Sequence, residues 1–573
     1  MATIPSCHGS FGQPGATPVV SKSMEMNVMG TGWDYSMAWR HSAIWYNGRM
    51  RESRHRNGGM LRNTAVVGAM TALSRVLGLV REMMQSRFIG AGWEQSAFTL
   101  AFAIPNMARK LFGEGALTAA FVPVFKGAAA TDGIEDARRL ARAVMSMMLL
   151  MLGAVVALGI CGITAALDVL EPLSPRAVLI LQLTRLLLPY MIFICGAAFG
   201  MGVLNAMGRF AAASVMPCLL NVFWIGALAS LAFCGDIDVA ARVRRVATAI
   251  LVAGAAQMAF MFACMKRRGV APRFTFHGWG DAKTRLVWKN TAVAAMGAGA
   301  VQVNCMLDQF LGQLASPWAA GVIGYADRLM DLPLGVIGVA FGTVLLPTFS
   351  GHFARGDLAS ARRALLASAE KMLFVMVPAA VGLGILAPEV TRVIYEGRAF
   401  DAVATARVAR AVACYAIGLG FFGLQKSLVP WFQAQGDMKT PLAVSVKAVC
   451  LNAVLNVLAV ALLPVEWKHA GLAASTVVCA GWSCLLLVLA AHRRNGSLGL
   501  ATLVRPVGLT CIAAAAMGAM LAVARGLLAE FAAIRGWNAP WSGILQLAML
   551  VVLGAGAYFG VRLAVGRMRR FMV

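Results

Sequence analysis

Residues 143–166 read AVMSMMLLMLGAVVALGICGITAA and contain no charged side chain. A helix rises about 1.5 Å per residue, so about 20 residues cross the hydrocarbon core of a bilayer, which is roughly 30 Å thick. The stretch therefore predicts a transmembrane helix. Across the whole chain, 59% of the 573 residues are hydrophobic and 13% are charged, against about 45–50% and about 25% in soluble domains. The composition predicts an all-α, polytopic membrane protein.

Similar apolar segments recur from residue 63 to the end of the chain, and we count about 14 of them as predicted transmembrane helices. Two of them, 95–125 and 319–348, are longer than a crossing needs, and Pro105 and Pro333 are expected to break them. The predicted spans are 63–88, 95–125, 141–166, 177–203, 211–234, 240–265, 287–313, 319–348, 364–387, 404–432, 440–463, 470–491, 503–529 and 542–565.

The distribution of Lys and Arg predicts the orientation. The connecting segments and the tail on one side of the predicted membrane carry 23 of these residues, and the segments on the other side carry 9. Because basic residues accumulate in cytoplasmic loops, both termini are expected in the cytoplasm. This distribution also accounts for the net charge of +26, so we do not expect nucleic acid as a partner. Residues 1–60 are polar, lack the apolar core of a signal peptide, and predict a disordered cytoplasmic extension.

Several charges lie inside the predicted spans, where a Lys or Arg costs about 2.5–3.5 kcal/mol on insertion scales. SRVLGLVRE, residues 74–82, contributes Ser74, Arg75, Arg81 and Glu82 to one broad helical face. Such charges either line a wet cavity, pair with one another, or reach the interface. We interpret this face as part of a cavity.

Two further spans repeat the pattern. AIPNMARKLFGEGA, residues 103–116, places Asn106, Arg109 and Glu114 on one face. GYADRLMDLPLGVIG, residues 324–338, contains Arg328, which either pairs with Asp331 or faces the same cavity.

The four arginines of these spans have no matched carboxylates in the sequence pattern, which suggests an anionic ligand. A guanidinium offers a planar fork of donors suited to phosphate and does not readily lose its charge. Asp308 is a lone acid within its span. It is either a proton or cation site or a buried hydrogen-bonded group, with Lys447, Asn452 and Asn456 as candidate partners.

The sequence gives little support for metal binding, cofactor binding or catalysis. The 12 cysteines include no C-x-x-C pair, and the 7 histidines show no metal-ligand spacing. No nucleophile elbow, Walker loop or dinucleotide-binding fingerprint is present. We therefore expect no metal, no cofactor and no enzymatic activity.

The same segments carry a family resemblance. SRVLGLVRE (74–82), GAGWEQSAFTLAFAIPNMARKLFGEGALTAAFVPVF (90–125), YADRLMDLPLGVIGVAFGTVLLP (325–347), QGDMKTP (435–441) and KHAGLAAS (468–475) resemble the MviN/MurJ family of lipid II flippases. This family belongs to the multidrug/oligosaccharidyl-lipid/polysaccharide exporter superfamily. The resemblance runs from about residue 60 to the C-terminus.

The resemblance implies an architecture of two six-helix lobes followed by two helices that form a groove for a lipid tail. The domains would be an N-lobe (61–265), a cytoplasmic inter-lobe loop (266–286), a C-lobe (287–491), and a final helical pair with the tail (492–573). It also implies substrate-binding roles for Arg75, Arg81, Arg109, Arg328, Ser74, Asn106 and Glu114. Glu82 stands where the family usually has Asp, and Ser96 replaces a family Asp.

The implied function is movement of lipid II, the undecaprenyl-pyrophosphate-linked peptidoglycan precursor, from the inner to the outer leaflet of the bacterial cytoplasmic (inner) membrane. This transport by alternating access would serve cell-wall synthesis and cell shape. The expected partners are lipid II and membrane lipids, with cell-wall synthesis and division proteins as further candidates. Coupling to membrane potential, H⁺ or Na⁺ is expected, and Asp308, Asn452 and Asn456 are candidate ion-coupling residues.

Two alternatives remain open. One is a cation-coupled drug exporter of the same superfamily, whose cavity would carry carboxylates rather than four arginines. The other is a membrane-embedded polyprenyl-phosphate transferase. It would need clustered acidic residues at a cytoplasmic face, where the 266–289 segment has only Asp281.

Overall fold

The computed structural model describes residues 57–113, 116–170, 172–235, 237–535 and 542–568. Within these residues the chain forms 17 α-helices and one π-helical turn, η2, so the expected all-α fold is confirmed. The expectation of a disordered segment at 1–60 falls almost entirely outside the described residues.

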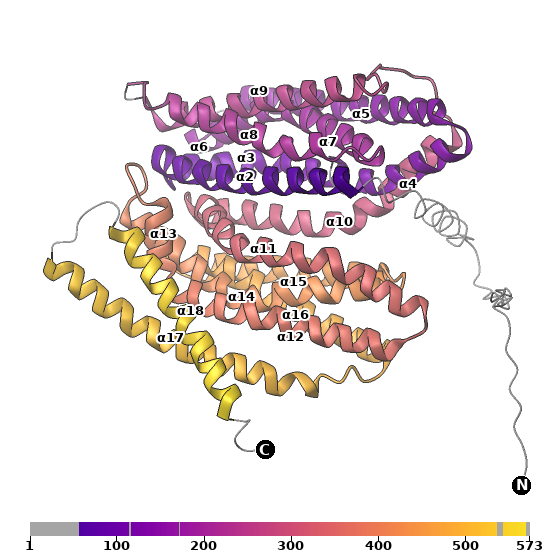
Figure 1. Cartoon of the computed structure of the whole chain (residues 1–573). Coiled ribbons are helices and arrows are strands. Elements are labelled where there is room, and N and C mark those ends of the chain that lie inside the picture. Colours follow the sequence, from indigo (N-terminus) through magenta and orange to yellow (C-terminus); the bar gives the residue numbers. More distant parts are fainter. Residues whose placement is uncertain (1–56, 114–115, 171, 236, 536–541, 569–573) are drawn as a thin grey trace, which may run out of the picture. The chain divides into compact units, whose positions relative to one another are not determined.

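The first group of helices precedes residue 267, and the second group follows it (Figure 1). The first comprises α2 (Asn57–Ile89), α3 (Trp93–Ala108), η2 (Arg109–Gly113), α4 (Ala116–Thr131), α5 (Ile134–Val169), α6 (Pro175–Leu187), α7 (Tyr190–Ala206), α8 (Ala211–Ser230) and α9 (Val239–Lys266). The second comprises α10 (Ala282–Ala315), α11 (Ala319–Ala354), α12 (Leu358–Ile385), α13 (Ala387–Tyr395), α14 (Ala402–Gln433), α15 (Lys439–Leu462), α16 (Val465–Asn495), α17 (Ala501–Arg535) and α18 (Ser542–Met568).

Each predicted span falls on helix within the described residues. Ten helical segments are long and apolar enough to cross a membrane; they comprise α5, α6 with α7, α8, α9, α12, and α14 to α18. The other four predicted spans correspond to α2, to α3 with η2 and α4, to α10 and to α11. Of these, α2, α10 and α11 have 33, 34 and 36 residues, more than the about 20 that a crossing needs.

The prolines have different effects in the two long spans. Pro105 lies inside α3, which ends three residues later at Ala108 and continues as the π-helical turn Arg109–Gly113, so the helix changes its geometry beyond Pro105 but is not broken at it as predicted. The break predicted at Pro333 is wrong, because α11 runs without interruption from Ala319 to Ala354. Loss of one backbone donor is tolerated in a long helix that is packed against neighbours.

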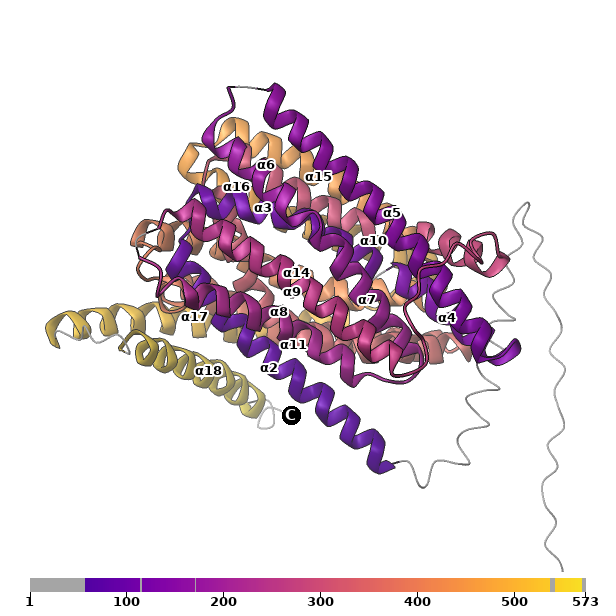
Figure 2. The ribbon, with the colours of Figure 1, turned by 90° about the horizontal axis from the view of Figure 1, so that it is seen from above.

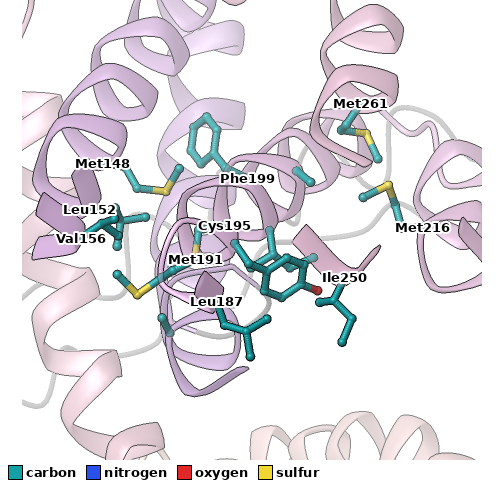
Figure 3. Close-up of a cluster of buried hydrophobic side chains, with 14 of the residues drawn as sticks. Met148, Leu152, Val156, Leu187, Met191, Cys195, Phe199, Met216, Ile250 and Met261 are labelled. Carbon is teal, nitrogen blue, oxygen red and sulfur yellow. The ribbon is translucent and has the colours of Figure 1, made fainter. Parts of the chain in front are cut away.

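Separate hydrophobic clusters form in the two groups of helices. The first cluster consists mainly of residues from the helices α3 through α9. Its buried side chains include Met148, Leu152, Phe199, Ile250 and Met261 (Figure 3). The second and third clusters draw mainly on α11, α12, α14 and α16. Each group therefore has apolar packing of its own.

The two last long helices form a pair beside the second group. α17 packs along α12 and α18, and α18 also contacts α13; both lie at one edge of the bundle in the two views (Figure 1, Figure 2). Their shared cluster includes Leu386, Met517, Leu521, Leu550 and Tyr558.

Candidate functional site: a charged cavity between helices

A cavity of about 560 Å³ lies between the two groups of helices, lined by side chains from α2, α3, η2, α7 to α9, α10 and α11. Its lining brings together six of the residues that the sequence selected: Ser74, Arg81, Glu82, Asn106, Arg109 and Arg328. Residues more than 250 positions apart in the sequence therefore share one polar space.

Arg81 is held on the α2 side of the cavity by three groups. Its guanidinium donates a 3.0 Å hydrogen bond to Asn221 Oδ1, forms an ion pair with Glu82, and lies 4.5 Å from the ring centroid of Trp224. The side chain is only 13% exposed. These contacts fix its position before any ligand binds, so little conformational entropy remains to be lost on binding.

Glu82 joins the two sides of the cavity. Its Oε1 accepts from Arg81 of the same helix and lies 3.6 Å from Nε of Arg328 on α11. The expectation that the arginines lack carboxylate partners is therefore wrong for Arg81 and Arg328. Among the described residues, Arg328 makes no ion pair with Asp331, so the local pairing considered from the sequence is not formed.

Arg109 begins the π-helical turn that follows α3. Its Nε and Nη2 donate to Oδ1 of Asn106, at 3.1 and 3.0 Å. The wider turn places Lys110 on the cavity wall beside Arg109. π-Bulges of this kind are frequent at functional sites.

One predicted residue does not belong to this lining, and another cannot be placed in it. Arg75 donates a 3.3 Å hydrogen bond to the carbonyl of Gly335 and so links α2 to α11, but it is not among the cavity-lining residues. The prediction that it faces the cavity is not met in this arrangement. Glu114 lies outside the described residues.

The cavity also contains polar residues that the sequence analysis did not select as site residues. Asn221 and Trp224 of α8 lie against Arg81, and Asp327 and Asp331 of α11 line the wall near Arg328. An Asn within the apolar run of α8 was the available signal, since polar side chains at that depth are rare. The lining thus carries both charges: Arg81, Arg109, Lys110 and Arg328 against Glu82, Asp327 and Asp331.

Asp308 lies in a second polar cluster and is not among the cavity-lining residues, although its neighbour Gln309 on α10 is. Its Oδ1 accepts from Nδ2 of Asn452 at 2.7 Å and of Asn456 at 2.6 Å, which confirms these two predicted partners, whereas the third, Lys447, is exposed and makes no ion pair with Asp308 among the described residues. Its Oδ2 accepts from Asn304 and Thr476, both at 3.3 Å. The cluster joins α10, α15 and α16, and Thr476 had not been predicted.

The carbonyl oxygens of the two asparagines have no hydrogen-bond partner among the described residues. Both Asn452 Oδ1 and Asn456 Oδ1 are buried, and Asp308 itself is only 8% exposed. Three oxygen-bearing side chains therefore converge in a buried place. Carboxylate and amide oxygens suit hard cations.

One end of the cavity is closed by contacts that we call the α3–α11 seal, made by Ser96, Gly321, Gln313, Gly90 and Tyr325. The amide of Gly321 donates to Ser96 Oγ at 2.9 Å, and Gln313 Nε2 donates to the Ser96 carbonyl at 2.6 Å. The Tyr325 hydroxyl donates to the Gly90 carbonyl at 3.0 Å. Ser96 is fully buried, and both its hydroxyl oxygen and its carbonyl oxygen accept hydrogen bonds in this seal.

Comparisons with known proteins agree with this geometry. The family model described as "Lipid II flippase MurJ" matches residues 85–535. A probable lipid II flippase MurJ from Rhizobium tropici is 30% identical over 88% of this chain and 94% of its own length. The lipid II flippase MurJ from Burkholderia cenocepacia is 31% identical over 88% of this chain and 98% of its own length.

Solved structures show the same fold. A lipid II flippase MurJ in an inward closed conformation superposes with a TM-score of 0.71 at 20% identity, covering 89% of this chain and all of that one. An inward-facing multidrug resistance MATE transporter of the MOP superfamily gives 0.62 at 15% identity, covering 76% and 98%. The family model and the curated relatives together cover most of the chain, so the protein belongs to the MurJ family of lipid II flippases.

Proposed function

We propose that this protein is a lipid II flippase of the bacterial cytoplasmic membrane, a transporter rather than an enzyme, which moves the lipid-linked peptidoglycan precursor from the inner to the outer leaflet. The observation that carries the proposal is the charged cavity between the two groups of helices, in a chain that belongs to this family. A pyrophosphate headgroup cannot enter the hydrocarbon core unaided, and guanidiniums on a wet internal wall supply the donors that it needs.

The arrangement of Arg81, Glu82 and Arg328 suggests how cargo and conformation are linked. Without cargo, Glu82 partly neutralises both guanidiniums and connects α2 to α11. A pyrophosphate that enters competes with Glu82 for the same donors. Binding therefore exchanges an internal ion pair for contacts with the cargo and loosens the connection between the two groups of helices.

We further propose that Asp308, Asn452 and Asn456 form the ion-coupling site. A bound cation would satisfy the two unpartnered asparagine oxygens and balance the Asp308 carboxylate. Asp308→Asn keeps the size of the side chain but removes its charge. We expect transport by this variant to lose its dependence on a Na⁺ or H⁺ gradient. An unchanged ion dependence would assign the cluster a purely structural role.

The orientation and the domain limits are part of the same proposal. With both termini in the cytoplasm, the α3–α11 seal closes the outer side and the cavity is reached from the inner leaflet. The N-lobe (61–265) and C-lobe (287–491) would rock about the cavity, and α17 and α18 would accompany the lipid tail. Cell-wall synthesis and division proteins are the candidate protein partners.

The test is complementation of cells depleted of their own flippase. We expect Arg109→Ala and Arg328→Ala to abolish growth, since each removes a donor from the cavity wall, and Arg75→Ala to abolish it by breaking the contact between α2 and α11. All three proteins should still reach the membrane at normal levels. The matched control is Arg139→Ala, which removes a side chain that is 73% exposed and whose one ion pair within the described residues is with Asp136. Normal wall synthesis by Arg109→Ala and by Arg328→Ala would overturn the headgroup-binding role, and normal wall synthesis by Arg75→Ala would show that the contact between α2 and α11 is dispensable.

A further inference from the structure

The segment between α9 and α10 carries a cluster of aromatic rings. The centroids of Phe274 and Phe276 are 5.0 Å apart, and those of Phe276 and Trp279 are 5.1 Å apart. Phe274 is 53% exposed and Phe276 is 64% exposed. Two neighbouring phenyl rings left open in this way indicate a surface that is covered by something apolar.

The depth of this cluster follows from its contacts with α5. The amide of Thr275, between the two phenylalanines, donates a 2.9 Å hydrogen bond to Oγ of Ser146. Ser146 lies four residues beyond Arg142, about 6 Å along the helix, within the first turn of the uncharged run 143–166. The segment packs closely here, because a Cβ added at Gly278 would lie 3.2 Å from that of Ala143. The rings therefore lie level with the start of the apolar part of α5.

Positive charge surrounds the rings. Residues 266–289 contain seven Lys and Arg and one acid, Asp281. Arg267, Arg268 and Arg273 are exposed, and none of them makes an ion pair within the described part of the chain. Arg285 is directed to the Gly280 carbonyl, where its Nη2 donates at 2.7 Å, and so stabilises the turn without reducing the charge.

We propose that residues 267–281 bind the anionic surface of the inner leaflet, with Phe274 and Phe276 in the boundary between headgroups and acyl chains and with Arg267, Arg268 and Arg273 on lipid phosphates. Aromatic side chains concentrate at this boundary, and cytoplasmic basic clusters bind anionic lipids. Because the rings of Phe274 and Phe276 lie level with the start of the apolar part of α5, lipid is favoured over a soluble partner. The choice of leaflet rests on the proposed orientation. This segment connects the two groups of helices. Its binding to lipid would therefore hold the connection between them at the membrane surface.

The test uses the full-length protein in nanodiscs, without lipid II, so that its outcome is independent of transport. The photoreactive residue p-benzoylphenylalanine replaces Phe276 and, in a second variant, Phe274. After irradiation in nanodiscs that contain phosphatidylglycerol, mass spectrometry should find phosphatidylglycerol joined to the segment. The yield should fall several-fold when Arg268→Gln and Arg273→Gln are added.

The matched control is Arg355→Gln with Arg493→Gln, which removes the same charge from the C-terminal ends of α11 and α16 and should leave the yield unchanged. Absence of lipid adducts at both positions would overturn the proposal. Adducts only with proteins, when the same variants are irradiated in native membranes, would instead indicate a protein partner. Equal yields of phosphatidylglycerol adducts with and without Arg268 and Arg273 would show that these arginines do not bind anionic lipid.

Discussion

Glu82 has two opposing effects on the cavity. It supplies the charge that makes two buried or half-buried guanidiniums tolerable, and it occupies donors that a phosphate would use. Its position next to Arg81 is visible in the sequence, but its approach to Arg328 depends on how α2 meets α11. Local spacing cannot reveal a contact across 246 positions, which is why the sequence analysis treated the arginines as unmatched.

Glu82→Gln should therefore destabilise the protein without cargo. The amide keeps the shape of the side chain but removes the negative charge shared by Arg81 and Arg328. Hydrogen bonds to charged groups contribute about 1.5–3 kcal/mol, so we expect the melting temperature in detergent to fall by several degrees. Glu82→Asp, which retains the charge, should recover part of the loss. An unchanged melting temperature in Glu82→Gln would show that the ion pairs contribute nothing to stability.

Asp437, between α14 and α15, gives a prediction that depends on pH. Burial alone would raise the pKa of this carboxyl, but hydrogen bonds from Thr440 and the nearby Arg494 guanidinium outweigh burial and hold the pKa below its ordinary value. A carboxyl with a lowered pKa in the folded state stabilises above its unfolded pKa, near 4, and loses this effect as the pH falls through its folded value.

Asp437→Asn should accordingly lower the melting temperature at pH 7. The difference from the unaltered protein should shrink as the pH falls below about 4. Thermal unfolding in detergent between pH 7 and pH 3 measures this difference. A gap that stays constant over the range would mean that ionisation of Asp437 does not stabilise the fold.

At the scale of elements, the seal between α3 and α11 depends on a close approach at Gly321. A Cβ at this position would lie 3.0 Å from Ser96 Oγ and 3.2 Å from Gln95 Cγ. Contacts this short require Gln95 and Ser96 at the start of α3 to shift by a few tenths of an ångström. The absence of a side chain on Gly321 therefore allows α11 to approach α3.

Gly321→Ala should shift the protein toward a state in which this end of the cavity is open. Spin labels on the N-terminal ends of α3 and α11 should report an added population at longer distance. Gly351→Ala, in the same helix, is the control, because a Cβ at that position meets nothing within 4 Å. An identical distance distribution in Gly321→Ala and in the unaltered protein would contradict the role of this contact.

Most elements were predictable because their signal is local. Uninterrupted apolar runs such as 143–166 gave helices at the expected places. The structure differs from the sequence prediction where packing between helices determines the course of the backbone. Pro333 lies within the continuous helix α11, whereas Pro105 is followed within a few residues by a π-helical turn. The short helix α13 was not expected, since the prediction relied on apolar runs of about 20 residues and α13 has only nine.

At the scale of the molecule, the sequence predicted the residue types of the site better than their contacts. Arg81, Arg109 and Arg328 meet at one cavity, and Asp308 meets both predicted asparagines. Arg75 contacts a backbone carbonyl of α11 instead of lining the cavity. Asn221, Trp224 and Thr476 were missed because their roles arise only when distant helices pack together.

The central claim is that the charged cavity carries a lipid-linked pyrophosphate across the membrane. The most direct measurement is leaflet-resolved detection of lipid II in cells depleted of their own flippase, with and without this protein. We predict that the protein raises the amount of lipid II accessible from outside and that Arg328→Ala, at equal membrane levels, does not. Equal amounts in the outer leaflet with the protein, without it and with the variant would contradict the claim.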